Sequence, residues 1–265
     1  MHSKYLKVPV EMATFALTEH KIKQVSTYLA SQFIYSGNAH SRDKPVHKIA
    51  ELTGYPVKSV YRYAKWLIKR NWFGKSPQGR YYFNGIRRVH QFESWRFARA
   101  VIMQPKDFKN FKAFISGVAI SNLAITKARH REHKATPRKH RSKNSAGLSI
   151  SYISNCINIS ASMAYRIRKL ANKAGYIKSE PNLIRIINLT PHDLKAAKAS
   201  NISKIPVQLF GYPGTFYSNI DKIRYKSSQL YLQEPNQIVP MLPIKSFKGL
   251  SKYRPPSVAS TVSLK

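Results

Sequence analysis

A segment of 38 residues occurs twice in this chain, 104 positions apart. Val46–Phe83 aligns without a gap on Ile150–Ile187, and apolar character matches at many of the other positions. The identical pairs are Ile49/Ile153, Tyr61/Tyr165, Arg62/Arg166, Lys65/Lys169, Lys69/Lys173 and Pro77/Pro181. Each copy has the pattern of a short helix, a turn, a basic helix and a two-stranded hairpin. The repeat therefore predicts two similar units, each holding a basic helix on a small apolar core.

The charge of the chain is extreme, with 46 Lys and Arg against 11 Asp and Glu, a formal net charge of +35. Self-repulsion of this size disfavours a compact state unless a polyanion neutralises it. Nucleic acid is the first candidate partner and an anionic membrane surface is the second. Solubility alone needs far less charge of one sign. At 43% hydrophobic residues, the chain also has enough apolar material for folded cores.

The sequence predicts no membrane span and no export signal. The longest strongly apolar run, Ala113–Thr126, is too short to cross a bilayer, and Glu11 interrupts the apolar N-terminal stretch. The single cysteine, Cys156, excludes an internal disulfide and fits a reducing compartment. Because Cys156 aligns with Leu52, we expect it in the core. The expected location is cytoplasmic and nucleoid-associated.

The predicted fold class is mainly α-helical with small β-hairpin wings. A long basic loop, 128–146, interrupts the second unit, and the Pro-containing segment after residue 190 shows little periodicity beyond a short helix at His192–Ser200. The predicted organisation is an extended lead-in at 1–18, a first unit at 19–90, a linker with a helix around Glu93–Met103 at 91–107, a second unit at 108–190, and an irregular basic segment at 191–265.

In the first unit, periodicity predicts helices over Glu19–Tyr35, Pro45–Gly54 and Lys58–Asn71, then strands over Trp72–Lys75 and Arg80–Phe83. The last helix should turn Val60, Ala64 and Leu67 inward. In the second unit, the same signals predict helices over Phe108–Lys127, Ser149–Ile157 and Ser160–Ala174, then strands over Tyr176–Ser179 and Leu183–Leu189 around a turn at Glu180–Asn182. Ser160 is a plausible N-cap, and Gly175 suits a left-handed C-cap.

A helix-turn-helix places its second helix in the major groove, where residues near the helix N-terminus reach bases and phosphates. Arg62 and Arg166 are the best candidates for base reading, because a guanidinium pairs with guanine O6 and N7 together. Lys65 and Lys169 suit phosphate anchoring. The full candidate sets are Lys58, Ser59, Tyr61, Arg62 and Lys65 in the first unit, and Ser160, Ser162, Tyr165, Arg166 and Lys169 in the second.

The predicted wings and the basic loop offer further cations for DNA. A solvated hairpin is the alternative for the wings, and a nonspecific solubility or localisation tract is the alternative for the loop. The loop would be extended by repulsion and would lie along phosphates or enter a minor groove. The candidates are Lys75, Arg80, Lys178 and Arg185 in the wings, and Arg129, Arg131, Lys134, Arg138, Lys139, Arg141 and Lys143 in the loop.

The sequence favours neither a metal site nor an enzyme. His130, His133 and His140 lack a second pair of Cys or His ligands nearby, and neighbouring cations disfavour a dication. No two acids lie closer than eight positions, and no Gly-rich loop ends in Gly-Lys-Ser/Thr. We therefore predict no catalytic residue, no metal and no cofactor. A recombinase or nickase with a tyrosine nucleophile remains an alternative.

The stretch Lys58–Phe73 resembles the recognition helix and first wing strand of winged-helix regulators, and Ser162–Ile177 resembles them more closely, through its Ala-Gly-Tyr-Ile ending. Two such domains in one basic chain resemble the replication initiators of plasmids and some phages. That resemblance implies binding to repeated sites at an origin, recruitment of host replication enzymes, and repression of the protein's own gene.

The resulting expectation is sequence-specific binding of double-stranded DNA by two winged-helix domains, in replication initiation of a plasmid or phage. The alternatives are a transcriptional regulator of a mobile element and a nonspecific DNA-condensing or packaging protein. The expected partners are double-stranded DNA, host replication proteins and a second copy of the chain as a homodimer, without a membrane.

Overall fold

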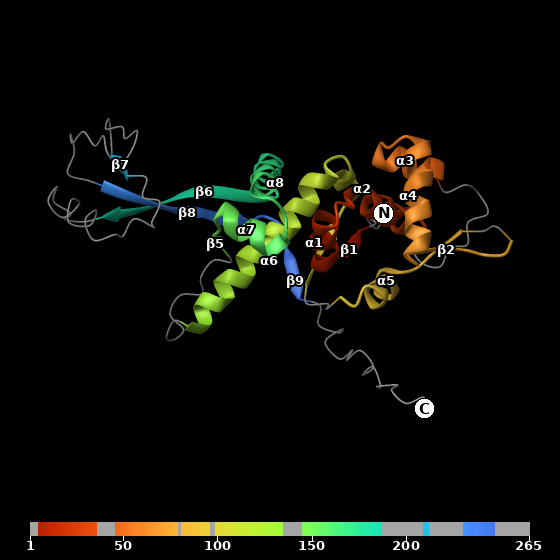
Figure 1. The fold of residues 1–265 in the computed structure, drawn as a ribbon, viewed down its shortest axis with the longest axis horizontal. Helices are drawn as coiled ribbons and strands as arrows, with labels where there is room; N and C mark the ends of the chain where they lie inside the picture. The colour runs from red at the N-terminus through yellow and green to blue at the C-terminus, as the bar shows by residue number, and fades with distance from the viewer. Residues whose placement is uncertain are drawn as a thin grey trace, which may run out of the picture.

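The computed structural model describes residues 5–35, 46–78, 81–95, 99–134, 145–186, 209–211 and 230–246. This part of the chain is mainly helical with small antiparallel sheets. The 24-residue helix α6 (Phe111–Lys134) crosses the middle of an elongated molecule, with helices α2 to α5 toward one end and a long strand pair toward the other (Figure 1). None of the described helices combines the length and apolar content needed to cross a membrane.

The first unit contains α2 (Ile22–Tyr35), α3 (Val46–Thr53), α4 (Val57–Lys69) and a hairpin of β2 (Phe73–Lys75) and β3 (Tyr81–Phe83). Both α3 and α4 pack on α2. Trp72 is fully buried, and its ring contacts those of Tyr28, Trp66 and Trp95 at 4.9, 5.9 and 5.8 Å between centroids. This aromatic cluster fixes the end of α4 to the rest of the unit.

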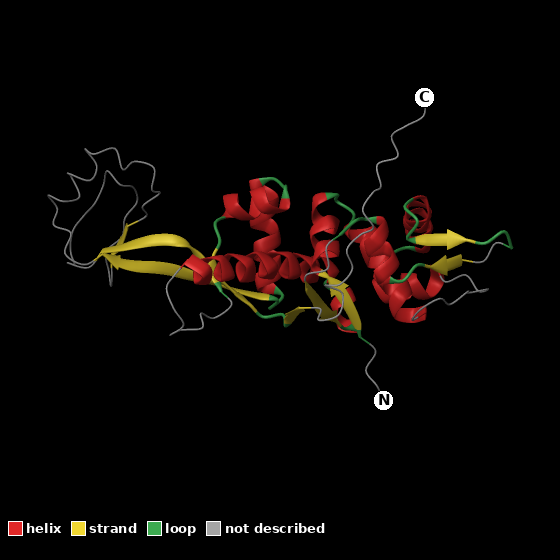
Figure 2. Cartoon of the chain, turned by 90° about the horizontal axis from the view of Figure 1, so that it is seen from below, coloured by secondary structure: helices red, strands yellow, loops and turns green. Residues whose placement is uncertain are grey.

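The second unit contains α6, β5 (Ala146–Gly147), α7 (Ile150–Ile157), α8 (Ala161–Lys173), β6 (Ile177–Ile186) and β8 (Leu230–Pro240). The strand order is β5-β8-β6, and β7 (Leu209–Gly211) also pairs with β8. Figure 1 shows β6 and β8 as a long antiparallel ribbon that extends away from the helices, and Figure 2 shows the same ribbon from below. The helix α6 packs against both α8 and β8, so it forms the base of this unit.

The structure confirms the internal repeat at the level of the backbone. The bounds of α3, α4 and the start of β2 coincide with those of α7, α8 and the start of β6 after a shift of 104 positions. The left-handed residues within the repeated segments follow the same shift: Gly54 and Asn158 have φ of 70° and 57°, and Asn71 and Gly175 have φ of 60° and 75°. The helices and turns of the two units are therefore equivalent, and the units diverge after their first strand.

A third group of elements joins the two units. The strands β1 (Leu6–Pro9), β4 (Arg99–Met103) and β9 (Ile244–Ser246) form a sheet with β4 in the centre. Helix α1 (Val10–Thr18) packs on α6, and Thr18 Oγ1 donates a hydrogen bond of 2.7 Å to the Ile157 carbonyl oxygen at the end of α7. The short helices α5 (Ile86–Phe92) and η1 (Pro105–Phe108) complete the connection. Buried residues from all these parts form one continuous core.

Two sequence predictions near these joining elements are wrong. The lead-in is not extended throughout, because Val10, Ala13 and Leu17 lie on one face of α1 and are buried. The predicted connecting helix at Glu93–Met103 is replaced by β4 in its C-terminal part, since Ala100 and Val101 are buried in a three-stranded sheet whose other strands lie far away in sequence.

The second predicted hairpin and the C-terminal segment also differ from the prediction. Residues 180–182 do not form a turn; β6 continues through them, with a register shift between Glu180 and Asn182. Pro181 is therefore accommodated at a bulge. Because β8 and β9 contribute to two sheets, residues 191–265 are not irregular throughout.

Three smaller predictions have different outcomes. Residues 128–134 of the predicted basic loop belong to α6, and residues 135–144 lie outside the described residues. Cys156 is exposed, so its predicted place in the core is wrong; the buried residues of α7 are Ile153 and Ile157. The predicted helix His192–Ser200 lies outside the described residues.

Candidate nucleic-acid interface

Helix α4 carries a stripe of exposed cations. Its inward residues are Val60, Ala64 and Leu67, as the sequence predicts, and these fix the orientation of the helix on α2. Residues spaced by three and four positions share one helix face. The exposed face of α4 therefore presents the α4 stripe, Lys58, Arg62, Lys65 and Lys69.

Helix α8 repeats this arrangement. Ala164, Ile167 and Ala171 are buried against the core, and Ser160 Oγ accepts a hydrogen bond from the Met163 backbone N–H at 3.2 Å, which confirms the predicted N-cap. Gly175 has φ of 75°, so the predicted left-handed residue after the helix is also confirmed. The exposed α8 stripe is Ser162, Arg166, Lys169 and Lys173, each 104 positions after its counterpart in the α4 stripe.

The predicted tyrosines align in the repeat but differ in exposure, and two predicted serines, which do not align with each other, are respectively engaged in a helix cap and half-buried. Tyr165 is 50% exposed, and the Arg168 guanidinium lies 6.0 Å from its ring centroid, whereas Tyr61 is half-buried against the core. Ser160 is occupied as an acceptor by the helix cap, and Ser59 is half-buried. The Tyr165 ring of α8 is therefore more accessible than the Tyr61 ring of α4.

The predicted wing residues are only partly placed. Lys178 is exposed on β6 and forms an ion pair of 2.7 Å with Glu180; the hydrogen bond to Glu180 raises the pKa of Lys178. The backbones of Lys75 and Arg185 lie in β2 and β6, and Arg80 lies outside the described residues. The structure therefore gives no common surface for these four cations.

The structure describes only residues 128–134 of the predicted basic loop and its last residues at 145–146. Arg129 is exposed near the end of α6, and the backbones of Arg131 and Lys134 belong to the last turns of that helix. The remaining candidates, Arg138, Lys139, Arg141 and Lys143, lie outside the described residues.

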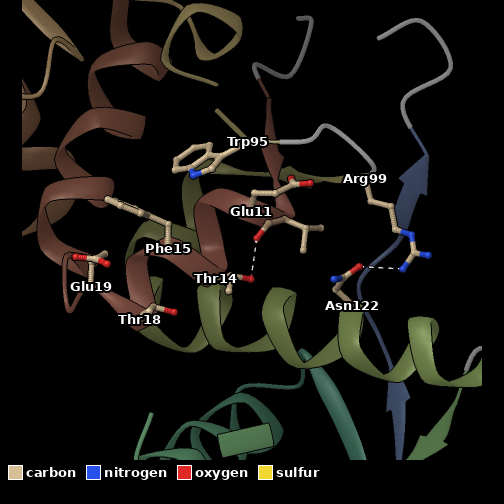
Figure 3. Close-up of a pocket in the computed structure, with 9 residues that line it drawn as sticks. Glu11, Thr14, Phe15, Thr18, Glu19, Trp95, Arg99 and Asn122 are labelled. Atoms are coloured by element: carbon tan, nitrogen blue, oxygen red, sulfur yellow. Dashed lines mark hydrogen bonds between the residues drawn. The ribbon is translucent and has the colours of Figure 1, made fainter. Parts of the chain in front are cut away.

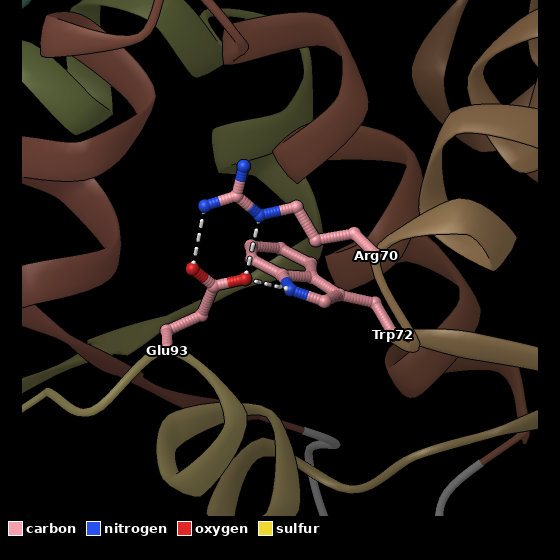
Figure 4. Close-up of polar contacts among 3 residues, drawn as sticks. All are labelled: Arg70, Trp72 and Glu93. Carbon is pink, nitrogen blue, oxygen red and sulfur yellow. Dashed lines mark hydrogen bonds and ion pairs between the residues drawn. The ribbon is translucent and has the colours of Figure 1, made fainter.

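Arg70, which follows α4 directly, has a structural partner. Its Nε and Nη2 atoms donate to the two oxygens of Glu93 at 2.8 Å each, and Trp72 Nε1 donates to the same carboxylate at 2.7 Å (Figure 4). Burial alone would raise the pKa of Glu93, but the hydrogen bonds from Arg70 and Trp72 outweigh it and lower the pKa. This cluster ties the end of α4 to the end of α5.

A cavity of about 350 Å³ beside α1 has Glu11 and Glu19 among the residues that line it (Figure 3). These residues lie eight positions apart at the two ends of one helix, which separates their backbones by about 12 Å at 1.5 Å per residue. Arg99 of β4 donates to Asn122 Oδ1 at 2.9 Å across the far side of the cavity. The spacing does not suit two carboxylates that share one metal ion or one proton transfer.

Within the described part of the chain, no group of three His, Cys, Asp or Glu residues could hold a metal ion. His130 is exposed near the end of α6, while His133 and His140 have no described side-chain environment. The charged groups exposed on the described helices are therefore mainly lysine and arginine side chains.

The structure also brings together cations that the sequence analysis did not select. Lys23, Lys109 and Lys112 line a groove between α4 and α8, together with Arg62. All three lysines lie outside the repeated segment, so comparison of the two copies gives no signal for them.

No family model, no curated protein and no solved structure matches this chain.

Proposed function

We propose that this chain is a sequence-specific double-stranded DNA-binding protein with two winged-helix domains. Each unit has a pair of helices joined by a tight turn, followed by antiparallel strands, which is the order that a winged helix requires. The second unit adds a short strand before its helix pair, and that strand lies next to β8 in the sheet. The helices α4 and α8 are the recognition helices in this proposal.

The observation that supports the proposal most directly is the match between the α4 and α8 stripes. Both stripes are exposed on helices whose opposite faces are buried, and their members follow the same spacing. An α-helix fits the major groove of DNA, and an arginine guanidinium exposed on that helix can pair with guanine. Matched arginines, Arg62 and Arg166, therefore provide one base-reading group in each unit, and the lysines provide phosphate contacts.

The proposed biological role is initiation of replication of a plasmid or phage, and it rests on the resemblance of a basic chain with two such units to that class of protein. A transcriptional regulator would use the same binding mechanism. The two roles are separated by testing whether a plasmid with the bound site as its origin replicates when the protein is absent. Loss of replication supports the initiator.

The binding mechanism is tested by Arg166→Lys and Arg62→Lys, which retain the charge and remove the planar fork of donors. Each change should cost roughly 1–3 kcal/mol on the selected site and relax the base preference at one position. The matched control is Lys169→Arg, which should leave the base preference unchanged because its contact is to phosphate. Equal loss of affinity on every sequence in the arginine variants would exclude base reading by these helices.

A further inference from the structure

A groove on the surface lies between the two units. This groove has a volume of about 720 Å³. Arg62 and Tyr63 of α4 form one wall, Met163 and Leu170 of α8 form the other, and the segment Phe108–Ala113 at the start of α6 lies between them. The groove therefore connects the two helices that carry the basic stripes.

The charged side chains that line this groove are all cationic. They are Lys23 at the start of α2, Arg62 on α4, and Lys109 and Lys112 at the start of α6, with His20 beside them. Among the residues that the structure describes, none that lines the groove is acidic. The positive end of the α6 dipole adds to the field of these four cations.

The groove lysines have no acidic partner among the described residues. Arg70 pairs with Glu93 and Lys178 pairs with Glu180, and neither ion pair involves a groove lysine. The acid nearest in sequence to Lys109 and Lys112 is Asp107, which is buried and accepts hydrogen bonds from the Gln104 backbone N–H at 2.7 Å and from Tyr176 Oη at 2.8 Å. The acid nearest to Lys23 is Glu19, which lines the separate cavity beside α1. The groove thus concentrates positive charge that the protein itself does not neutralise there.

We infer that the groove is a phosphate-binding site for the sugar-phosphate backbone of the DNA, with Lys23, Lys109 and Lys112 as its contacts. This inference rests on the proposed function and extends it to residues outside the recognition helices. Ammonium groups act as point charges without a preference for base, so the groove adds affinity equally on every sequence. Because Arg62 belongs to both the α4 stripe and the groove, the surface from one to the other is continuous.

The test is the double variant Lys109→Ala/Lys112→Ala, compared with Arg87→Ala/Arg88→Ala. Both variants remove two exposed cations, but the arginines lie on α5, which does not line the groove. In the view of Figure 1, α5 lies on the opposite side of the molecule from α3 and α8. Binding to a selected duplex and to a scrambled duplex is measured over a series of salt concentrations, after unchanged thermal unfolding has verified each fold.

If both lysines contact phosphates, the slope of log K against log salt becomes shallower by about 1.8, which is two contacts at about 0.9 each. At about 0.1 M salt this difference amounts to roughly 60-fold in affinity, equal on both duplexes. The arginine control should retain the wild-type slope. The inference is overturned if the lysine variant keeps the wild-type slope, or if the control loses as much as the lysine variant does.

The arginine and lysine variants together distinguish failure of the groove assignment from failure of the proposed function. If Arg166→Lys relaxes base preference while the lysine variant binds as the wild type does, the groove assignment fails and the DNA-reading mechanism stands. If the wild-type protein shows no preference for any duplex but the lysine variant flattens the salt slope, base reading fails and the groove assignment stands.

Discussion

The cluster around Glu93 leads to a quantitative prediction about stability. Glu93→Gln keeps the side-chain shape but replaces one carboxylate oxygen with an NH₂ group that faces the Arg70 guanidinium. The carboxylate side chain is 8% exposed, and that of Arg70 is 42% exposed. The Trp72 N–H keeps an acceptor, but the acceptor becomes neutral, and charge-assisted hydrogen bonds are roughly twice as strong as neutral ones.

The expected loss has two parts. Weakening of the Trp72 bond costs about 1 kcal/mol, and loss of one bond to Arg70 costs about 1–2 kcal/mol after a discount for the exposure of the guanidinium. The free energy of unfolding should fall by about 2–3 kcal/mol in total. For a chain of this size the corresponding fall in Tm is about 5–10 °C. Unfolding by urea or heat, followed through tryptophan fluorescence, measures this difference.

The matched control is Glu180→Gln, which breaks the exposed ion pair with Lys178. Exposed pairs contribute about 0–1 kcal/mol, so this variant should unfold nearly as the wild type does. The two glutamate variants remove the same charge, and their difference therefore reports the burial and geometry of the Glu93 cluster.

The effect of Glu93→Gln should also depend on pH. The pKa of Glu93 is lowered from its ordinary value of 4.5 in the folded state, so its contribution is complete above about pH 4.5 and is lost as the pH falls through the lowered pKa. The stability gap between wild type and variant should close in that range. A gap below about 0.5 kcal/mol at pH 7, or one that persists unchanged to pH 3, would refute the assigned role of the carboxylate.

Three further changes test other contacts by equilibrium unfolding. Tyr176→Phe removes the donor to Asp107 and should cost about 1.5–3 kcal/mol; a cost near zero would contradict a role for this bond in joining the units. Burial lowers the pKa of His90 from 6.5 to about 4, so the stability that its neutral form contributes is complete above about pH 6.5 and is lost as the pH falls toward 4. His90→Gln should therefore flatten the dependence of unfolding free energy on pH in this range. An unchanged slope would exclude His90 as the titrating group. Gly175→Ala should lower the free energy of unfolding by about 1–2 kcal/mol, because a residue with a Cβ is strained at a φ of 75°. Asn71→Gly, at the equivalent position, removes a similar backbone strain and should not destabilise in this way. Equal changes in stability for the two variants would contradict the argument from φ.

The repeat predicted the helices and turns well because their signals are local. The buried positions Val60, Ala64 and Leu67 recur at helical spacing, and Ser160 and Gly175 mark the ends of α8 through side-chain and backbone preferences that act within one turn. Such features depend on neighbours in sequence, and the structure confirms them.

The strands were harder to predict because their partners lie far away in sequence. Ile177 pairs with Pro240 and Ile186 with Leu230, so β6 needs a strand that begins more than forty positions later. Without that partner, Glu180-Pro181-Asn182 has the composition of a turn. In the same way, Arg99–Met103 forms a strand because β1 and β9 flank it, although its local sequence permits a helix.

The residues of the candidate site also divide into those that local sequence predicts and those that only long-range packing brings together. The members of the α4 and α8 stripes could be predicted, because they lie on the polar face of helices with a clear apolar face. Lys23, Lys109 and Lys112 could not, because only the packing of α2, α4, α6 and α8 brings them to one groove. Neither their spacing nor their type distinguishes them from other lysines in a chain with 46 Lys and Arg.

The most direct test of the central claim is selection of bound duplexes from a random pool at about physiological salt, where nonspecific contacts are weak. If Arg62 and Arg166 read bases, as we propose, the selection recovers a motif with two half-sites or repeated elements. Absence of enrichment, with affinity that follows ionic strength alone, would contradict sequence reading and would support a DNA-condensing protein instead.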